Sequence, residues 1–593
     1  MQISLTRRVA CRARRQDVWP RLADTERLNR FIGNSPLTVA PADGQARFVL
    51  GTRLGPAKVE YEELPYEWSE NEFFSFRRVM RSGPVAELAV RYELADGASE
   101  GAEVSMTMEV TPTSAFTWPI VSIFSRRFAD RIDSYIRAVD EAALHGRTVA
   151  GGRRRVSQSG LDRASHELAR RHPAALVDRL LGHIADADDL ELRRIRPFAL
   201  ADAWGTEVAR LDVLKLCLDA VKVGLLELHW DVLCPSCRVA AASFATLAEL
   251  GDHDHCHVCE LDYGIEADRA VEATFTPHPM VRHVRRDWFC IGGPIVTPPV
   301  VGQRLLPAGA TGSLGAPTAP GHYRLFVRGG AETALDVLGD GPAEVDVNVG
   351  AALASPTHTR IATGGRVQVH NDGPPRHAKI ERVGDLRADA TALHVAMLPA
   401  FRAQFGGDSL RPGLALKVSH VAILFSDLVG STALYSRIGD AAAFGVVTDC
   451  LHFGREVVER HGGTVVKTMG DAVMAAFIDE RAAVAAAGDA LASWPGFQRG
   501  HTHADTLDLK IGAYAGPCTV VTANGVLDYF GQTVNAAARV QHLARARELV
   551  LPTSLERAAA ACTTLGVIER FETRVKGIDA PLSLLRLGPP TRN

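Results

Sequence analysis

The chain lacks a long hydrophobic run, an excess of charge of one sign, and the cysteine density of a disulfide-stapled protein. The apolar stretch FTWPIVSIF at 116–124 is far shorter than the roughly 20 residues of a membrane-spanning helix. Lys and Arg number 66 against 69 Asp and Glu, so no overall field favours nucleic acid or an anionic membrane. The basic first residues have no apolar signal-peptide core behind them, and we expect a cytoplasmic protein without a membrane span.

Length and cysteine content set the next limits. A chain of 593 residues is too long for one hydrophobic core, so several domains are expected. Ten cysteines without a secretory signal argue against a disulfide framework. The patterns along the chain predict a multidomain α+β protein.

Residues 1–146 read as one α+β unit. An amphipathic helical pattern at 18–32 precedes alternating strand-like runs such as AKVEYEEL and AEVSMTMEV, and a long helical pattern at 124–144 closes the segment. This order resembles the START-like (SRPBCC) helix-grip fold, a resemblance that implies a cavity for an apolar small ligand. A packed domain without a ligand remains the alternative.

The composition then changes to a linker and a helical segment. Residues 147–160 are small, polar and basic, as in a linker. Helical patterns within 161–231 end on an extended run, an order that resembles a winged-helix unit. Because the protein is near neutral, we expect a structural or interaction module and no nucleic-acid partner.

A cysteine cluster follows at 232–270. Cys234 and Cys237 form one CxxC pair, Cys256 and Cys259 form a second, and eighteen residues separate the pairs. Two such pairs supply the four sulfurs of a tetrahedral Zn²⁺ site, and the spacing fits a zinc ribbon with one structural ion. A redox CxxC would leave the second pair unexplained, whereas His253, His255 or His257 could replace one cysteine ligand.

Two further segments lead to the C-terminal third. Residues 271–383 contain strand-like runs between Gly/Pro turns, beginning with VEATFTPHP, and we expect a β-sandwich-like domain. A helical connector is expected at 384–414, the last domain at 415–587, and a tail at 588–593.

The segment VAILFSDLVGSTALYSRIGD at 421–440 carries the first chemical signal. An apolar strand at 421–425 ends at Asp427, and Gly430, Ser431 and Thr432 lead into a helix with Ala433, Leu434, Ile438 and Phe444 on one face. A carboxylate at a strand end holds a cation, while the N–H groups and dipole of the next helix meet phosphate oxygens.

Two later motifs add complementary groups. In GGTVVKTMGDAVMAAF at 462–477, Gly470 and Asp471 lie at the tip of an expected hairpin, so Asp427 and Asp471 could hold a pair of divalent ions. In the helix of LDYFGQTVNAAARVQHLA at 527–544, Asn535 and Arg539 share one face. An amide and a guanidinium there suit a ribose oxygen and a phosphorus centre gaining negative charge.

FSDLVGST, VVKTMGDAVMAAF and DYFGQTVNAAAR, in this order and spacing, closely resemble class III nucleotidyl cyclase catalytic domains. Some bacterial cyclases also carry START-like and zinc-ribbon regions upstream. The resemblance implies a ferredoxin-like βαββαβ core, a head-to-tail homodimer and two Mg²⁺ or Mn²⁺ ions per site. It assigns the metals to Asp427, Asp471 and the Leu428 carbonyl, the ribose to Asn535, the transition state to Arg539, the base to Lys467 and Asp528, and a triphosphate contact to Lys576.

The base-reading residues indicate ATP. Lys467 can only donate and an ionised Asp528 can only accept, which fits N1 and the exocyclic amine of adenine and opposes guanine. The sequence therefore predicts a signalling adenylate cyclase, a lyase forming cyclic AMP and pyrophosphate, under the control of its N-terminal domains. The alternatives are a nucleotide-binding scaffold without turnover and, less favoured, a guanylate cyclase.

Overall fold

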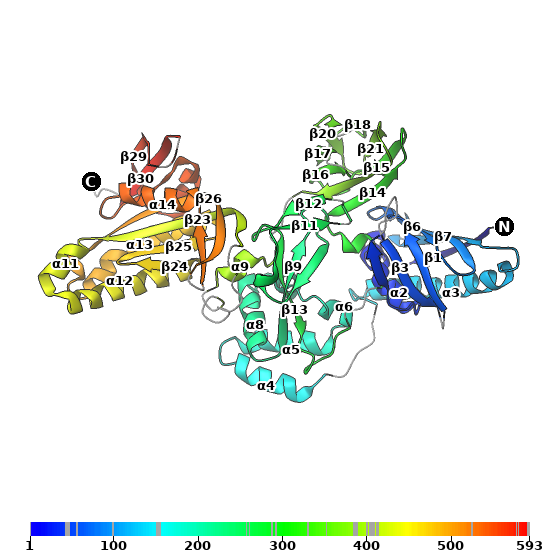
Figure 1. Cartoon of the computed structure of the whole chain (residues 1–593), viewed down its shortest axis with the longest axis horizontal. Helices are drawn as coiled ribbons and strands as arrows, with labels where there is room; N and C mark the ends of the chain where they lie inside the picture. Colours follow the sequence, from blue (N-terminus) through cyan, green and yellow to red (C-terminus); the bar gives the residue numbers. More distant parts are fainter. Residues whose placement is uncertain are drawn as a thin grey trace.

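The computed structural model shows an elongated arrangement, with the N-terminal sheet at one end and the C-terminal domain at the other (Figure 1). Among the described helices, none combines the length and the apolar content that crossing a membrane requires. The structure describes residues 2–41, 48–54, 57–97, 100–149, 156–256, 258–259, 261–285, 289–290, 293–328, 331–350, 353–383, 389–398, 401, 410, 414–523, 526–576, 578 and 580–589.

The N-terminal lobe contains the predicted alternation of early helices, strands and a long closing helix. The basic start of the chain, for which no strand was expected, forms β1, because its alternating side chains pair with β8 from Ile3 opposite Val110. The single early helix is two helices that meet at Ala23 and Asp24. The elements are β1 (Ile3–Cys11), α1 (Arg15–Leu22), α2 (Thr25–Phe31), β2 (Thr38–Pro41), β3 (Phe48–Leu54), β4 (Ala57–Glu63), β5 (Glu67–Ser69), β6 (Phe73–Met80), β7 (Val85–Asp96), β8 (Ala102–Pro112) and α3 (Trp118–Leu144).

Aromatic side chains occupy the space between this sheet and its helices. Phe74 stacks on Tyr92 at 4.5 Å between ring centroids, and Trp19 meets Phe74 edge-on at 6.0 Å. Tyr135 of α3 is fully buried and donates a hydrogen bond to the Arg21 carbonyl. Side chains of the sheet and of its helices thus pack against one another at this place.

The β-rich segment forms two sheets that share one core. Within the described residues, β5 pairs with β14, so the N-terminal sheet continues as β14-β22-β16-β17-β20, while the second sheet has the order β15-β21-β18-β19. Buried residues of both sheets, including Leu325 and Val367, form a common cluster, as expected of a sandwich. The strands are β14 (Val300–Leu306), β15 (Thr311–Gly315), β16 (Gly321–Val327), β17 (Ala331–Leu338), β18 (Glu344–Val349), β19 (Ala354–Ser355), β20 (His358–Ala362), β21 (Arg366–Asn371) and β22 (Arg376–Arg382).

Assigning VEATFTPHP to the β-rich segment was wrong. This run contains β13, which pairs with β9 in the three-stranded sheet β10-β9-β13. All side chains of β13 are buried there, as in a strand that is covered on both faces. The elements of this middle region are α4 (Gln158–Leu168), α5 (Ala174–Asp186), α6 (Asp189–Leu192), α7 (Pro197–Trp204), α8 (Arg210–Lys222), β9 (Leu226–Leu233), β10 (Ala240–Phe244), β11 (His253–Cys256), β12 (Leu261–Gly264) and β13 (Val271–Pro277).

The connector before the last domain is anchored at both of its described ends. It contains the short helix α9 (Ala392–Ala396), and Ala273 donates a backbone hydrogen bond to the Ala390 carbonyl. Phe401 packs edge-on against Trp230 of β9 at 6.0 Å. The rest of the helix expected at 384–414 falls largely outside the described residues.

The C-terminal domain has the predicted βαββαβ order. β23, α12, β24, β25, α13 and β26 form this unit, and their strands lie in the order β24-β25-β23-β26, with β28, β30 and β29 extending the sheet. The elements are β23 (Leu416–Val429), α11 (Ser431–Ile438), α12 (Asp440–Arg460), β24 (Thr464–Met469), β25 (Ala472–Phe477), α13 (Glu480–Gly500), β26 (Asp508–Ala523), β27 (Val526–Phe530), α14 (Gln532–Leu543), β28 (Leu549–Pro552), α15 (Glu556–Cys562), β29 (Gly566–Thr573) and β30 (Leu582–Gly588).

Two faces of this sheet carry different cores. Ala422, Leu424 and Leu428 of β23 pack with α12 and α13, whereas Ile423 and Phe425 point to the opposite face, where Ala537 of α14 lies. A side chain at Gly512 of β26 would collide with the backbone of Gln541, so this glycine lets α14 lie directly on the strand.

Candidate active site and cysteine cluster

Asp427 lies near the end of β23, on the face of the sheet that carries α14. Its Oδ2 is 3.0 Å from Lys510 Nζ, because Asp427 and Lys510 are direct partners across β23 and β26. Gln541 Nε2 of α14 donates to the same oxygen at 3.4 Å. Sequence reasoning missed Lys510 and Gln541, since their proximity depends on strand register. The carboxylate already attracts a cationic group, as a metal ligand should.

Asp471 lies at the same end of the sheet as Asp427. It follows Gly470, whose φ of +65° closes the turn between β24 and β25, and Val473 pairs with Ser426 just before Asp427. Asp471 is half-buried and lines a small cavity of about 30 Å³ together with Cys450. The antiparallel pairing therefore brings the two predicted carboxylates to neighbouring strand ends.

The turn after β23 leads directly into the N-terminus of α11. Gly430 precedes α11 with a φ of +96°, and a side chain there would press on the Thr506 carbonyl, so glycine is required. Ser431 and Thr432 form the first turn of α11, whose first backbone N–H groups have no partner within the helix. Anionic oxygens can be received here.

Lys467 and Asp528 are brought together. Lys467 Nζ of β24 donates to Asp528 Oδ2 of β27 at 2.6 Å. The lysine side chain is 39% exposed and the aspartate 13%, so the pair is sheltered but reachable. Lys467 also lies over the Phe530 ring at 5.6 Å from its centroid. One donor and one acceptor thus stand side by side beside an aromatic face.

Asn535 and Arg539 project from α14, as their spacing predicts. Asn535 is exposed and Arg539 half-buried, and neither side chain has a partner among the residues the structure describes. Lys576 is exposed in the loop before β30, likewise without a described partner. These three groups remain available to a bound molecule, but no contact joins them to Asp427.

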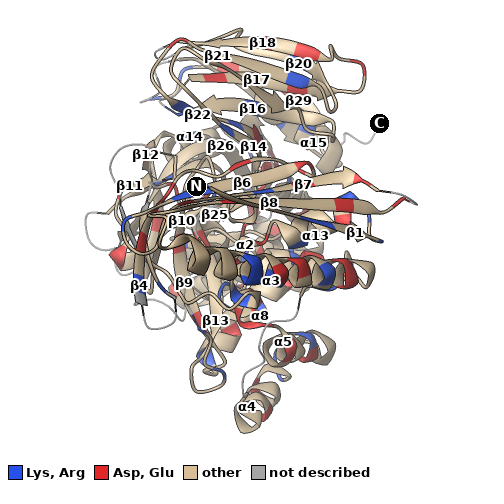
Figure 2. Ribbon diagram, turned by 90° about the vertical axis from the view of Figure 1, so that its right-hand side faces the viewer, with Lys and Arg blue, Asp and Glu red and all other residues tan. Residues whose placement is uncertain are grey.

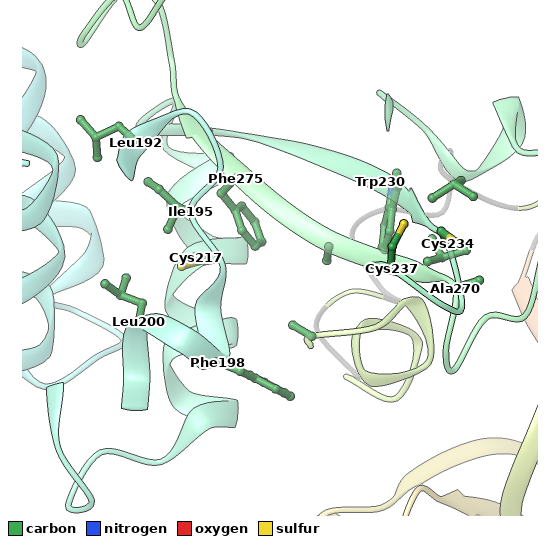
Figure 3. Close-up of a cluster of buried hydrophobic side chains, with 14 of the residues drawn as sticks. Leu192, Ile195, Phe198, Leu200, Cys217, Trp230, Cys234, Cys237, Ala270 and Phe275 are labelled. Carbon is green, nitrogen blue, oxygen red and sulfur yellow. The ribbon is translucent and has the colours of Figure 1, made fainter. Parts of the chain in front are cut away.

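The four cysteines predicted to bind zinc converge on one point. All are buried, and their sulfur atoms lie within 4.8 Å of one another. The Sγ atoms of Cys237 and Cys256 are 3.7 Å apart, close to the ~3.8 Å edge of a tetrahedron with Zn–S bonds of about 2.3 Å. Figure 3 shows Trp230 beside Cys237 and Cys234 in the neighbouring core. The arrangement fits a closed four-sulfur zinc site.

The group of potential metal ligands at this point contains the four cysteines and neither of the described histidines, His253 and His255. His255 Nδ1 pairs with Asp262 Oδ1 at 2.7 Å and His253 is exposed, while His257 lies outside the described residues. Lys379 of β22 is buried and donates to Cys259 Sγ at 3.0 Å. Hydrogen bonds from the other three thiols, together with the Lys379 ammonium, lower the pKa of Cys259, whereas the shared hydrogen bonds raise the pKa values of Cys234 and Cys237.

A separate cleft of about 1600 Å³ lies where the N-terminal lobe, the middle region and the β-rich sheets meet. Its wall includes Glu272, which is fully buried and accepts hydrogen bonds from Arg194 and Arg196, both at 2.7 Å. Burial raises the pKa of Glu272, and the two guanidinium groups oppose that effect. None of the predicted cyclase residues lines this cleft.

Comparison with known proteins agrees with the geometry of the C-terminal domain. Residues 415–583 match the family model of the adenylate and guanylate cyclase catalytic domain, and residues 162–287 match a family of unknown function, DUF5939. The C-terminal part of the chain is therefore a nucleotidyl cyclase catalytic domain of class III.

Three matching proteins cover between 27% and 30% of this chain. Guanylate cyclase 2G of Mus musculus is 29% identical over 177 residues, which are 27% of this chain and 16% of that protein. An adenylate cyclase of Lachancea kluyveri is 30% identical over 195 residues, 29% of this chain and 10% of that protein. The adenylyl cyclase CyaB of P. aeruginosa, a solved structure, is 22% identical, with 30% of this chain and 98% of that chain covered and a TM-score of 0.27. The chain thus spans a small part of the curated relatives it matches.

Proposed function

We propose that the C-terminal domain is an adenylate cyclase that converts ATP to 3′,5′-cyclic AMP and pyrophosphate. The observation that carries the choice of base is the contact of Lys467 with Asp528 at 2.6 Å. An ammonium and a carboxylate at one point offer a donor to N1 and an acceptor to the exocyclic amine of adenine. Guanine would meet a like group at both positions, at a cost of roughly 1–3 kcal/mol for each unpaired group.

The residues around Asp427 suit the triphosphate and its cations. Asp427, Asp471 and the Leu428 carbonyl would hold two Mg²⁺ or Mn²⁺ ions, because the Asp427 carboxylate already binds the Lys510 ammonium and Asp471 stands at the adjoining strand end. Bound there, the ions would supply charge neutralisation and a more acidic ribose 3′-hydroxyl. Lys510 must leave Asp427 when a cation takes its place, and it is then free to face the phosphates.

The remaining groups position the nucleotide. The first turn of α11, at Ser431 and Thr432, would receive phosphate oxygens, and Lys576 would add a cation. From α14, Asn535 would orient the ribose and Arg539 would stabilise the charge that develops on the α-phosphate. In-line attack of the 3′-hydroxyl then needs positioning and charge stabilisation, and no side-chain base is assigned.

A homodimer would complete the site. Lys467, Asp528, Asn535 and Arg539 have no described contact with Asp427, so we infer that one copy holds the metals and a second copy reads the nucleotide. The Asp427→Asn and Arg539→Ala variants should each be inactive, and mixing them should restore activity, because one site of the mixed dimer then contains neither substitution. A sedimentation experiment in which the active species is a monomer would contradict this arrangement.

Contacts with the upstream regions support our proposal that they control the domain. Ser419, in the first half of β23, bonds Asp268 through its backbone N–H at 3.0 Å and through its hydroxyl group. The Tyr529 hydroxyl, next to Asp528, lies 3.6 Å from Met397 Sδ of the connector. Both the metal-bearing strand and the base-reading strand thus touch the preceding domains, which supports a regulatory role for them.

The decisive experiment incubates the full chain with ATP or GTP and Mn²⁺ and measures cyclic nucleotide and pyrophosphate. We expect cyclic AMP from ATP, one to four decades less product from GTP, and no product from Asp471→Ala with an unchanged melting temperature. Absence of product from the unsubstituted chain would favour a nucleotide-binding scaffold. Equal or faster turnover of GTP would refute the proposed reading of the base.

A further inference from the structure

The first turns of α3 expose large apolar side chains that the fold does not cover. Phe116, just before the helix, is 97% exposed, and Ile120, Ile123 and Phe124 are 56%, 54% and 65% exposed. Positions 120, 123 and 124 share one side of the helix, whereas Val121 and Ser125 on the other side are buried. One side of the helix is therefore packed against the fold over these turns, and the opposite side presents large apolar residues to water.

Basic residues follow this patch, and Asp130, the first acidic residue after them, is paired with Arg7. Arg126 and Arg127 are exposed one turn further on, and neither has an ion pair with a described residue. From Thr111 to Ala129 the chain contains no Asp or Glu, and Asp130 pairs with Arg7 at 2.8 Å. Further along, α3 carries both acidic and basic residues (Figure 2). The local charge beside the patch is thus positive in a chain whose net charge is −3.

The patch lies at an outer end of the molecule. β8 leads into α3, and its residue Val110 pairs with Ile3 at the start of the chain. The N-terminus marks that end in Figure 1, far from the C-terminal domain. A flat surface can therefore approach the patch without meeting the other domains.

We propose that this patch, Phe116, Ile120, Ile123 and Phe124 with Arg126 and Arg127, docks the protein on the surface of an anionic lipid membrane. Aromatic and branched side chains enter the boundary between headgroups and acyl chains, while arginines one turn away remain level with the lipid phosphates. A two-fold contact with a second copy is disfavoured, since it would bring both pairs of arginines together. The nine-residue apolar stretch fits shallow insertion, not a membrane span.

Vesicle co-sedimentation of the full chain tests this docking independently of catalysis. The lipids are phosphatidylcholine alone and phosphatidylcholine mixed with phosphatidylglycerol, at low and high salt. The test variants are Phe116→Ser with Phe124→Ser, and Arg126→Gln with Arg127→Gln. The controls are Phe444→Ser, at a phenylalanine that is also 65% exposed, and Arg455→Gln, at an exposed arginine of α12. All these side chains are at the surface, so the melting temperatures should stay close to that of the unsubstituted chain.

We expect binding to the anionic vesicles that weakens with salt. Loss of the two phenylalanines should lower the partition coefficient roughly tenfold for each, and loss of the two arginines should lower it about thirtyfold in total. The controls should bind as the unsubstituted chain does. The proposal is overturned by absence of binding, by equal binding to phosphatidylcholine alone, or by test variants that bind normally. Self-association in sedimentation velocity that the phenylalanine variants abolish would assign the patch to a second copy instead.

Discussion

Replacing Gly512 by alanine should disable the cyclase while leaving the domain folded. The new Cβ would collide with the backbone N and Cα of Gln541, which cannot rotate away as a side-chain end could. Helix α14 must therefore move outward by about 1 Å, and a displacement of this size at reacting groups costs on the order of 100-fold in rate. Asn535 and Arg539 both project from that helix, so we expect kcat to fall by about 100-fold.

The same substitution has a calculable effect on stability. Overpacking of a close backbone contact costs roughly 1–3 kcal/mol. For a domain of this size each kcal/mol lowers the melting temperature by about 2–4 °C, so a fall of about 2–12 °C is expected. The domain should still be folded at 25 °C, which separates loss of activity from loss of structure.

Gly445→Ala provides the matched control. Gly445 lies within α12, and an added Cβ there meets no atom within 4 Å. Alanine should therefore stabilise the helix by up to about 1 kcal/mol and leave turnover unchanged. The assay measures cyclic AMP formation from ATP with Mn²⁺, alongside thermal melting of each variant. Normal kcat in Gly512→Ala, or an equal loss in Gly445→Ala, would refute the argument that this close contact positions α14.

Three further predictions concern other parts of the chain. Elemental analysis should find one zinc ion per chain. The Cys259→Ser variant should lose both the zinc and thermal stability, whereas His255→Ala should retain the zinc. Retention of zinc in Cys259→Ser would contradict the four-cysteine site. Lys467→Met should reduce discrimination between ATP and GTP by roughly tenfold or more, because the donor to adenine N1 disappears, and an unchanged ratio of kcat/KM values would remove Lys467 from base reading. Burial lowers the pKa of His394 from 6.5 to about 4. As the pH falls, the imidazole is therefore protonated in the unfolded chain before it is protonated in the folded one. The free energy of unfolding should keep its full value above pH 6.5 and fall by up to roughly 3 kcal/mol towards pH 4. Urea unfolding at pH 7 and pH 5 should show this loss in the unsubstituted chain but not in His394→Leu. An equal change in the free energy of unfolding between the two pH values in both proteins would contradict the prediction.

The sequence was informative where a local pattern determines the outcome. The CxxC spacing brought the four sulfurs together, and the continuous apolar run from Val421 to Phe425 produced the expected central strand ending near Asp427. Gly470 closed the predicted hairpin with a positive φ. In each case a short pattern of residues determined the local structure, although the partners that complete it lie further along the chain.

The sequence was uninformative where the strand register, or a break between two helices, determines which residues meet. Lys510 meets Asp427 only because β26 pairs with β23 in one particular alignment, and the sequence contains no sign of that alignment. Phe444 was expected on the apolar face with Leu434, yet it is 65% exposed. Gly439, with a φ of +80°, ends α11 and starts a new helix, so the two residues belong to different helical phases.

The bond between Ser419 and Asp268 gives β23 a fixed support at one end, while Asp427 stands near the other. Eight residues of extended chain separate these points, which is roughly 26 Å. Because a strand hydrogen-bonded on both sides does not stretch, a small tilt of the region that carries the four cysteines would displace the carboxylate at the far end of β23. A fragment that begins at residue 415 would retain the strand but lose the hydrogen bond that supports its first half.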